Sequence, residues 1–357
     1  MAGNNDIKFM RRCLELAGKA EGRTYPNPLV GSVIVHDDII IGEGYHLKAG
    51  EPHAEVNALN SVSDKGLLKS SVLYVNLEPC SHHGKTPPCV ELIISHGIRK
   101  VVIGTADTTE KVAGKGIALL KDAGCEVVTG VLETECRWIN RRFFTFNEKK
   151  RPYIILKWAQ SADGYLDYER DKKPDQKPMW ITGKPERVLV HIWRAAEQSI
   201  LAGAGTIRYD DPQLNVRFWT GNDPVRVILS SSGMLKKEAA VFRTNGTNIV
   251  FTQNTETDVT NAEIVKLDNF RPSAFQITEY LHSKDVQSLL IEGGAVVLNH
   301  FISEGQWDEA KVFTGKNSFR KGVKAPEISG KVLSHAIFSR SSLEVIINDK
   351  ESDIRSG

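Results

Sequence analysis

Residues 72–89 read VLYVNLEPCSHHGKTPPC, and this stretch indicates the fold of the first half of the chain. The largely apolar run over 72–77 predicts a strand that leads directly towards Cys80. A helix is expected to begin at Cys89 and to stop at Gly97. Strands and helices alternate on both sides of this stretch, which predicts a largely parallel sheet with helices on both faces. Both cysteines then lie where helix starts and strand ends favour thiolates and ligands.

The same patterns predict the elements around this stretch. A helix capped by Asp6 precedes a hairpin that turns at Asp37-Asp38. The hairpin strands cover residues 30–35 and 39–41. The other expected elements of the first half are helices over 53–59 and 117–122 and strands over 100–103 and 126–131.

A charged run over residues 147–152 ends in proline and predicts a short linker. A chain of 357 residues is long enough for two cores, so we expect domains over 1–147 and 151–357. The charged, proline-containing residues 167–178 are expected to form an exposed loop. The second half is again α/β, with strands over 153–157, 199–201, 225–229, 248–251, 288–291 and 309–313 and helices over 186–197 and 295–303.

Composition narrows the class of protein. The net charge of +2 does not favour a nucleic-acid or membrane surface. No apolar run approaches the roughly 20 residues that cross a bilayer, and residues 1–8 lack the apolar core of a signal peptide. The five cysteines are an odd number and widely spread, which predicts reduced thiols and a cytoplasmic location. Cys13, Cys125 and Cys136 are expected to be buried and inert.

One imidazole and two thiolates, from His53, Cys80 and Cys89, form a set of three zinc ligands. Three protein ligands leave the fourth tetrahedral position open to water, which is typical of a catalytic zinc site. Zinc would lower the pKa of that water towards ~7, and Glu55 can move protons between the water and a substrate. His-x-Glu followed by Pro-Cys and a second cysteine is the pattern of zinc deaminases that act on nucleobase-like rings.

The spacing of the two cysteines is by itself only moderately specific, because zinc sites usually place cysteines two to four residues apart. Taken singly, each ligand could be an ordinary free thiol or a surface histidine. His46, His82, His83 and Lys85 lie near the ligands in sequence and are candidates for substrate contacts. His191 and the remaining histidines have no partner motif and are expected to be structural or exposed.

Four segments of the first half resemble a known family: TYPNPLVG at 24–31, GEGYH at 42–46, AGEPHAE at 49–55 and residues 78–89. They resemble the deaminase domain of the bifunctional riboflavin-biosynthesis deaminase/reductase family, which shares the longer cysteine spacing. The resemblance implies a cytidine-deaminase-like three-layer domain. It implies that 2,5-diamino-6-(5-phosphoribosylamino)pyrimidin-4(3H)-one loses its 2-amino group as ammonia. The implied substrate contacts are Asn27, His46, Ala54, His82 and Lys85.

Glycine runs at 203–206 and 292–295 follow predicted strands, where backbone N–H groups can meet a phosphate. An ordinary turn is the better explanation of either run taken by itself, and the second half has no Rossmann fingerprint. Residues 157–164, 180–182, 205–217 and 292–294 nevertheless look like the reductase domain of the same family. Two positions, Ala162 and Ser230, depart from the family pattern.

This second resemblance implies a dihydrofolate-reductase-like α/β domain that uses NADPH to reduce the ribosyl side chain to a ribityl chain. The implied NADPH contacts are Ala159, Trp180, Thr206, Asp210 and Gly294. The implied substrate contacts are Lys157, Arg194, Leu214, Arg217 and Glu292. The guanidinium groups of Arg194 and Arg217 suit the substrate phosphate.

Two other hypotheses compete with a zinc- and NADPH-dependent enzyme. A nucleic-acid or nucleoside deaminase with a non-catalytic second half would need a basic patch interleaved with aromatic residues, which the near-neutral charge disfavours. A non-enzymatic module would need a fourth protein ligand to zinc, and His82 or His83 could supply one. A homo-oligomer is expected, because small α/β domains often expose a sheet edge.

Overall fold

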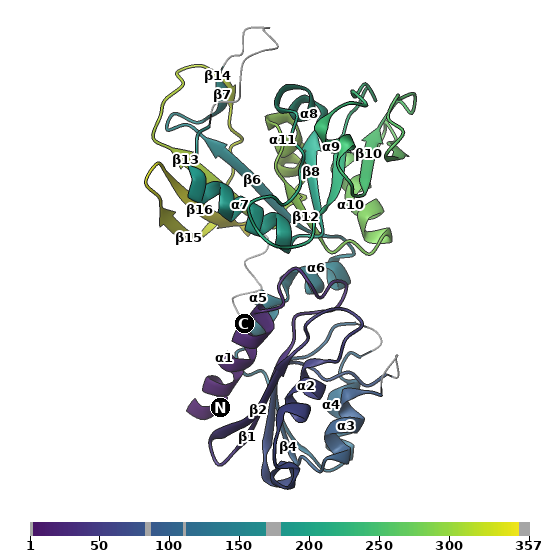
Figure 1. Ribbon diagram of the computed structural model, residues 1–357, viewed down its shortest axis with the longest axis vertical. Helices are drawn as coiled ribbons and strands as arrows, with labels where there is room; N and C mark the ends of the chain where they lie inside the picture. Colours follow the sequence, from purple (N-terminus) through teal and green to yellow (C-terminus); the bar gives the residue numbers. More distant parts are fainter. Residues whose placement is uncertain (1–2, 83–86, 110–111, 169–179, 350–357) are drawn as a thin grey trace. The chain divides into compact units, whose positions relative to one another are not determined.

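The computed structural model describes residues 3–82, 87–109, 112–168 and 180–349, and it divides into two compact units between Lys149 and Lys150 (Figure 1). The division lies inside the charged run predicted to be a linker. Residues 147–149 belong to a helix instead, because the amphipathic turn that buries Phe143 and Phe144 continues to Lys149. No helix among the described residues is long and apolar enough to cross a membrane. The cytoplasmic location stays a prediction.

The first unit is built on a sheet with the strand order β2-β1-β3-β4-β5. The hairpin places β1 between β2 and β3, and both of its pairings are antiparallel. The pairings of β3 with β4 and of β4 with β5 are parallel. The prediction of a largely parallel sheet is therefore wrong for the hairpin side. The bounds are β1 (Gly31–His36), β2 (Ile39–Tyr45), β3 (Val72–Leu77), β4 (Lys100–Thr105) and β5 (Glu126–Thr129).

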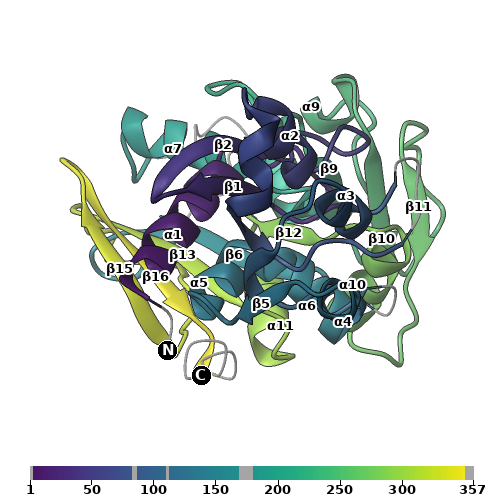
Figure 2. The same cartoon turned by 90° about the horizontal axis from the view of Figure 1, so that it is seen from below.

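Helices cover both faces of this sheet. Alternate side chains of a strand point to opposite faces, so Ile34 packs with α2, α3 and α4, whereas Val33 packs with α1 and α5. Figure 2 shows β1 between α1 and α2. Cys13 and Cys136 are buried as predicted, but Cys125 is half-buried. The bounds are α1 (Asn4–Gly18), α2 (Ala54–Ser61), η1 (Lys65–Ser70), α3 (Cys89–Ser95), α4 (Lys115–Asp122), α5 (Glu133–Ile139) and α6 (Arg141–Lys149).

The second unit is built on a sheet with the order β11-β10-β9-β8-β12-β6-β13-β16-β15. The pairings from β11 to β13 are parallel, and β16 and β15 continue the sheet antiparallel. Sequence patterns predicted six of these strands and missed β11, β15 and β16. The bounds are β6 (Tyr153–Gln160), β8 (Ser199–Gly203), β9 (Val225–Leu229), β10 (Asn248–Thr252), β11 (Glu263–Lys266), β12 (Ser288–Ile291), β13 (Glu309–Gly315), β15 (Lys331–Ile337) and β16 (Ser341–Ile347).

Two helices, α10 and α11, pack on one face of this sheet around Leu156 and Leu289. The helices α7, α8 and α9 pack on the other face, around Ile155, Ile200 and Ile228. The bounds are α7 (Lys184–Ala196), α8 (Ala204–Asp210), α9 (Ala240–Arg243), α10 (Ser273–Ser283) and α11 (Ala295–Ser303). Because helices cover both faces of the sheet, the carboxyl ends of the parallel strands are the place where a site can form.

The loop predicted over 167–178 begins as a strand. β7 (Tyr165–Tyr168) pairs antiparallel with β14 (Gly322–Lys324), a segment more than 150 residues away in sequence. A partner so distant cannot be recognised from local patterns. Residues 169–178 of the predicted loop lie outside the described residues.

Candidate functional sites

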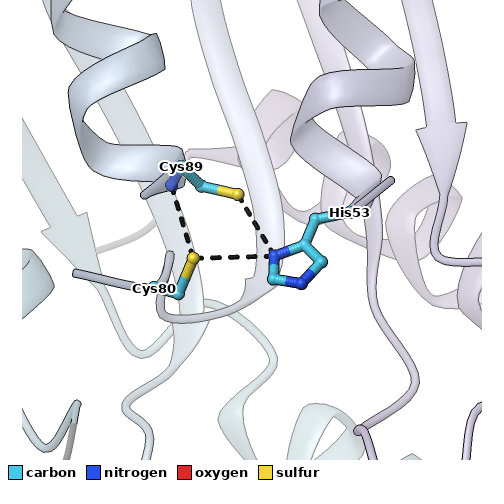
Figure 3. Close-up of side chains that lie close together, drawn as sticks. All are labelled: His53, Cys80 and Cys89. Atoms are coloured by element: carbon cyan, nitrogen blue, oxygen red, sulfur yellow. Dashed lines mark hydrogen bonds between the residues drawn. The ribbon is translucent and has the colours of Figure 1, made fainter. Parts of the chain in front are cut away.

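Three side chains from different elements converge in the first unit (Figure 3). His53 immediately precedes α2, Cys80 lies just beyond β3, and Cys89 is the first residue of α3. Nδ1 of His53 is 3.5 Å from Sγ of Cys80 and 3.4 Å from Sγ of Cys89. Tetrahedral bonds of roughly 2.3 Å to sulfur and 2.1 Å to nitrogen give an S–N separation of about 3.5 Å. The donor atoms therefore fit a zinc ion.

The start of α3 also polarises one sulfur. The backbone N–H of Cys89 donates to Sγ of Cys80 at 3.3 Å. The neighbouring Cys89 thiol, the His53 ring and this N–H lower the pKa of Cys80 to about 4. The Cys80 sulfur and burial together raise the pKa of Cys89. Cys80 is thus held in the thiolate form, which is the form that binds metal.

Glu55 lies on the first turn of α2 and is only 3% exposed. Burial, followed by the nearby Cys80 sulfur, raises the pKa of its carboxyl to about 7. A carboxyl whose pKa is near neutrality can both accept and donate a proton.

A hydrogen-bonded chain runs beside the His53 ring, which packs edge-on against His46 at a centroid distance of 5.4 Å. Nδ1 of His46 is 3.1 Å from the carbonyl oxygen of Pro52, and Nε2 is 3.0 Å from Nδ2 of Asn27. A carbonyl can only accept, so Nδ1 carries the proton and Nε2 accepts from the Asn27 amide. Burial lowers the pKa of His46, which keeps the ring neutral. His46 thereby fixes the orientation of the Asn27 carboxamide.

The other predicted contacts of this site differ in placement. Ala54 is fully buried at the start of α2, between the ligand His53 and Glu55. His82 is exposed in the segment that follows Cys80. Lys85 lies outside the described residues.

In the second unit, Lys157, Arg194 and Glu292 form a buried charged cluster. Nε and Nη2 of Arg194 donate to the two carboxylate oxygens of Glu292 at 2.7 and 2.8 Å. Nζ of Lys157 is 3.5 Å from the same carboxylate. Burial would raise the pKa of Glu292, but Arg194 and Lys157 outweigh it and hold the pKa at about 2. The Arg194 guanidinium therefore faces a carboxylate of the protein.

The cluster continues into the segment that holds Leu214 and Arg217. Nη1 of Arg194 donates to the carbonyl oxygen of Asn215 at 3.0 Å. The backbone N–H of Arg217 donates to Nδ1 of His191 at 3.0 Å. Leu214 is buried in the core with a φ of +52°, so its side chain anchors this segment.

His191, for which the sequence offered no partner motif, joins this cluster as a buried structural residue. It is buried on α7, and burial, followed by the charges of Arg194 and Arg217, lowers its pKa to about 4. Its position three residues before Arg194 places both side chains on one helix face. That spacing is the signal that could have linked His191 to the site.

Four of the five predicted cofactor residues lie on β6 or in the segments that directly follow β8 and β12. Thr206 is in the first turn of α8 and Gly294 directly precedes α11. A Cβ on Gly294 would lie 3.4 Å from Oγ1 of Thr206, so the two helix starts meet. Ala159 is the penultimate residue of β6, and Asp210 is the last residue of α8. Trp180 is 64% exposed.

A cavity of about 1000 Å³ lies beside α8. Its lining includes Ala204, Ile207, Arg208, Gly233 and Lys236. Gly205 lies in the first turn of the same helix, and a Cβ added to it would meet no atom within 4 Å. The cavity lies at strand carboxyl ends, but none of the five predicted cofactor contacts is among its lining residues.

Comparison with known proteins identifies both units. Residues 3–105 match the family model of the cytidine and deoxycytidylate deaminase zinc-binding region, and residues 152–315 match the RibD C-terminal domain. The riboflavin biosynthesis protein RibD of Aquifex aeolicus is 38% identical, over 95% of this chain and 92% of its own length. This chain belongs to the RibD family. RibD of Bacillus amyloliquefaciens is 39% identical, over 84% of this chain and 82% of its length.

A solved RibD-type structure supports the same assignment. The diaminohydroxyphosphoribosylaminopyrimidine deaminase/5-amino-6-(5-phosphoribosylamino)uracil reductase of Thermotoga maritima superposes with a TM-score of 0.88 at 38% identity. The match covers 96% of this chain and 99% of that one. A RibD structure from Acinetobacter baumannii has a TM-score of 0.86 at 32% identity, covering 96% and 98%.

The protein is therefore a bifunctional deaminase and reductase of riboflavin biosynthesis. Its first unit has the cytidine-deaminase-like fold and its second the dihydrofolate-reductase-like fold, as predicted. Zinc belongs to the first unit and a nicotinamide cofactor to the second. The RibD C-terminal domain excludes the hypothesis of a non-catalytic second half.

Proposed function

We propose that the first unit deaminates 2,5-diamino-6-(5-phosphoribosylamino)pyrimidin-4(3H)-one and that the second reduces the product with NADPH. The name of the Thermotoga maritima relative describes these two activities. The observation that carries the proposal is the convergence of His53, Cys80 and Cys89 at zinc-ligand distances beside the buried Glu55. A homo-oligomeric state and the absence of nucleic-acid binding stay predictions.

In the deaminase step we assign His53, Cys80 and Cys89 as zinc ligands and Glu55 as the catalytic acid and base. Zinc supplies Lewis-acid activation of the attacking water. Glu55 takes a proton from that water and delivers protons to the ring nitrogen and to the departing amine. Its burial keeps competing solvent away from the carboxyl while protons move.

We assign the substrate contacts of this step to Asn27, Ala54, His82 and Lys85, with His46 behind Asn27. Because the Asn27 amide N–H is directed to His46, the Asn27 carbonyl oxygen is the atom that can accept from a pyrimidine N–H. The Ala54 backbone lies between a ligand and the catalytic carboxyl, where a flat ring would pack. The exposed His82 side chain and the Lys85 ammonium are suited to hydrogen-bond the substrate phosphate.

In the reductase step we assign Lys157 and Glu292 to the ribosyl chain and Arg217 to the phosphate. A nicotinamide cofactor supplies a hydride to the sugar carbon. Lys157 is buried, which lowers its pKa, and its ammonium can donate a proton to a sugar oxygen. Arg194 holds the Glu292 carboxylate in place through two hydrogen bonds. Leu214 fixes the backbone that carries Arg217.

NADPH is the proposed form of the nicotinamide cofactor. We assign its contacts to Ala159, Trp180, Thr206, Asp210 and Gly294. The adjoining cavity is lined by the two basic residues Arg208 and Lys236 and by four carboxylates, Asp211, Glu238, Glu256 and Asp258. The choice of NADPH over NADH therefore rests on the family resemblance and not on the charge of this cavity.

Two assays on the purified holoprotein test the proposal. The diamino substrate should release one ammonia per molecule in the absence of any nicotinamide cofactor. NADPH should be oxidised only when the deaminated phosphoribosyl intermediate is present, and NADH should be a poorer donor. Absence of ammonia release would refute the deaminase substrate, and equal use of NADH would refute the cofactor assignment.

A further inference from the structure

One buried carboxylate next to the zinc ligands has no role in the proposed chemistry. Glu78 is 4% exposed and accepts four backbone N–H groups. Oε2 accepts from Asp107 and Gly114 at 3.1 and 3.0 Å. Oε1 accepts from Gly116 and Ile117 at 2.9 and 3.1 Å. Four donors match the full accepting capacity of a carboxylate.

Glu78 joins two segments of the first unit. Its own backbone N–H donates to the carbonyl oxygen of Thr105 at 3.0 Å, which holds the end of β3 beside β4. Its side chain reaches the loop after β4 and the first turn of α4. The N–H groups of Gly116 and Ile117 have no partner within that helix, so Glu78 satisfies them from outside. The residues that follow Glu78 are Pro79 and the ligand Cys80.

The start of α4 also contacts the backbone of Pro79. A Cβ on Gly116 would lie only 2.3 Å from the carbonyl oxygen of Pro79 and 3.1 Å from Oε1 of Glu78. Glycine is therefore required for α4 to approach the segment that leads to Cys80. The hydrogen bonds of Glu78 hold this segment against α4, and the absence of a side chain at Gly116 leaves room for the contact.

We propose that Glu78 is a positioning residue of the zinc site. It holds Pro79 against the start of α4 so that Sγ of Cys80 meets both Nδ1 of His53 and the N–H of Cys89. Replacing a group that orients a metal ligand typically lowers metal affinity or activity by about 10–100-fold. This inference rests on the proposed role of Cys80 as a zinc ligand.

Glu78→Gln is the decisive variant, because it keeps the size of the side chain but turns an NH₂ group against backbone N–H donors. The measurement is the rate at which zinc passes from the holoprotein to a coloured chelator. We expect this rate to rise about 10-fold or more, with ammonia release lowered and reductase activity of the same molecules unchanged. Glu126→Gln, at an exposed carboxylate paired with Lys100, is the matched control and should behave as wild type.

Gly116→Ala tests the same contact from the other side and should also speed zinc release, since its Cβ displaces Pro79. It keeps the proposal testable if Glu78→Gln folds poorly. A Glu78→Gln protein that melts at a lower temperature but releases zinc at the wild-type rate would show a purely structural role and overturn the inference. If Cys80→Ser retained zinc as well, the proposed ligand set itself would be wrong. If Cys80→Ser loses zinc while Glu78→Gln releases it at the wild-type rate, only the role of Glu78 is refuted.

Discussion

The zinc site of the first unit and the charged cluster of the second are both buried and polar, but they are built differently. The proposed zinc ligands come from residues 53–89 and lie beyond a strand end or at helix starts, and one backbone N–H donates to the Cys80 sulfur. Lys157 on β6, Arg194 on α7 and Glu292 just beyond β12 are further apart in sequence, and the two cations share one carboxylate. The comparison predicts that damage to the zinc site removes chemistry, whereas damage to the cluster also removes stability.

The largest effect is expected for Glu55→Gln, which keeps the shape of the side chain and removes its ability to transfer protons. Deaminase kcat should fall by about 10²–10⁴-fold, the usual contribution of a general acid and base. Zinc content and reductase activity should stay at wild-type values. Metal analysis and the two activity assays on one preparation check this, and undiminished ammonia release would remove Glu55 from the mechanism.

Glu292→Gln should destabilise the second unit, because it leaves Lys157 and Arg194 buried without a counter-charge. We expect the free energy of unfolding to fall by about 3–5 kcal/mol, together with a loss of reductase activity. Urea unfolding measures the first effect. Glu279→Gln, at an exposed pair with Arg271, should cost no more than about 1 kcal/mol. Equal costs at the two sites would contradict the contrast between buried and exposed pairs.

His46→Leu should disturb binding more than chemistry at the zinc site. The variant removes the acceptor that orients Asn27, and one such hydrogen bond is worth about 1 kcal/mol. We therefore expect KM for the diamino substrate to rise about 5-fold with zinc retained and kcat less affected. Steady-state kinetics separate the two constants. A fall in kcat alone would place His46 closer to the reacting atoms.

The last expected effect is a pH dependence of stability in the second unit. His191 has a pKa of about 4 when folded against its ordinary 6.5 when unfolded. Between these values the unfolded chain binds the extra proton, so the free energy of unfolding should fall as pH drops through this window. Above about 6.5 the effect should be absent. His191→Asn, whose side-chain oxygen can still accept from the Arg217 N–H, should flatten the dependence. If the free energy of unfolding of His191→Asn, measured by urea unfolding, changes with pH between 7 and 5 as it does in the wild type, the titrating group is not His191.

Local sequence patterns predicted the helices and strands whose bounds are set by nearby residues, such as an apolar run or a terminating glycine. The strand before Cys80 and the helix at Cys89 appear where the apolar run and the following glycine place them. β15 was missed because most of its residues are exposed, and β7 because its partner is distant in sequence. The β1–β2 hairpin was recognised, but the antiparallel pairing of β1 with β3 is a long-range contact that local patterns do not predict.

Residue type and spacing within one short region were enough to predict the metal chemistry of His53, Glu55, Cys80 and Cys89. It also indicated the family of both halves. Only the tertiary structure revealed that Arg194 is held by Glu292, that His191 supports Arg217, and that Glu78 ties Cys80 to α4. Those interactions join residues 26 to 98 positions apart, and their energies depend on burial and geometry that arise only when the sheets bring the segments together.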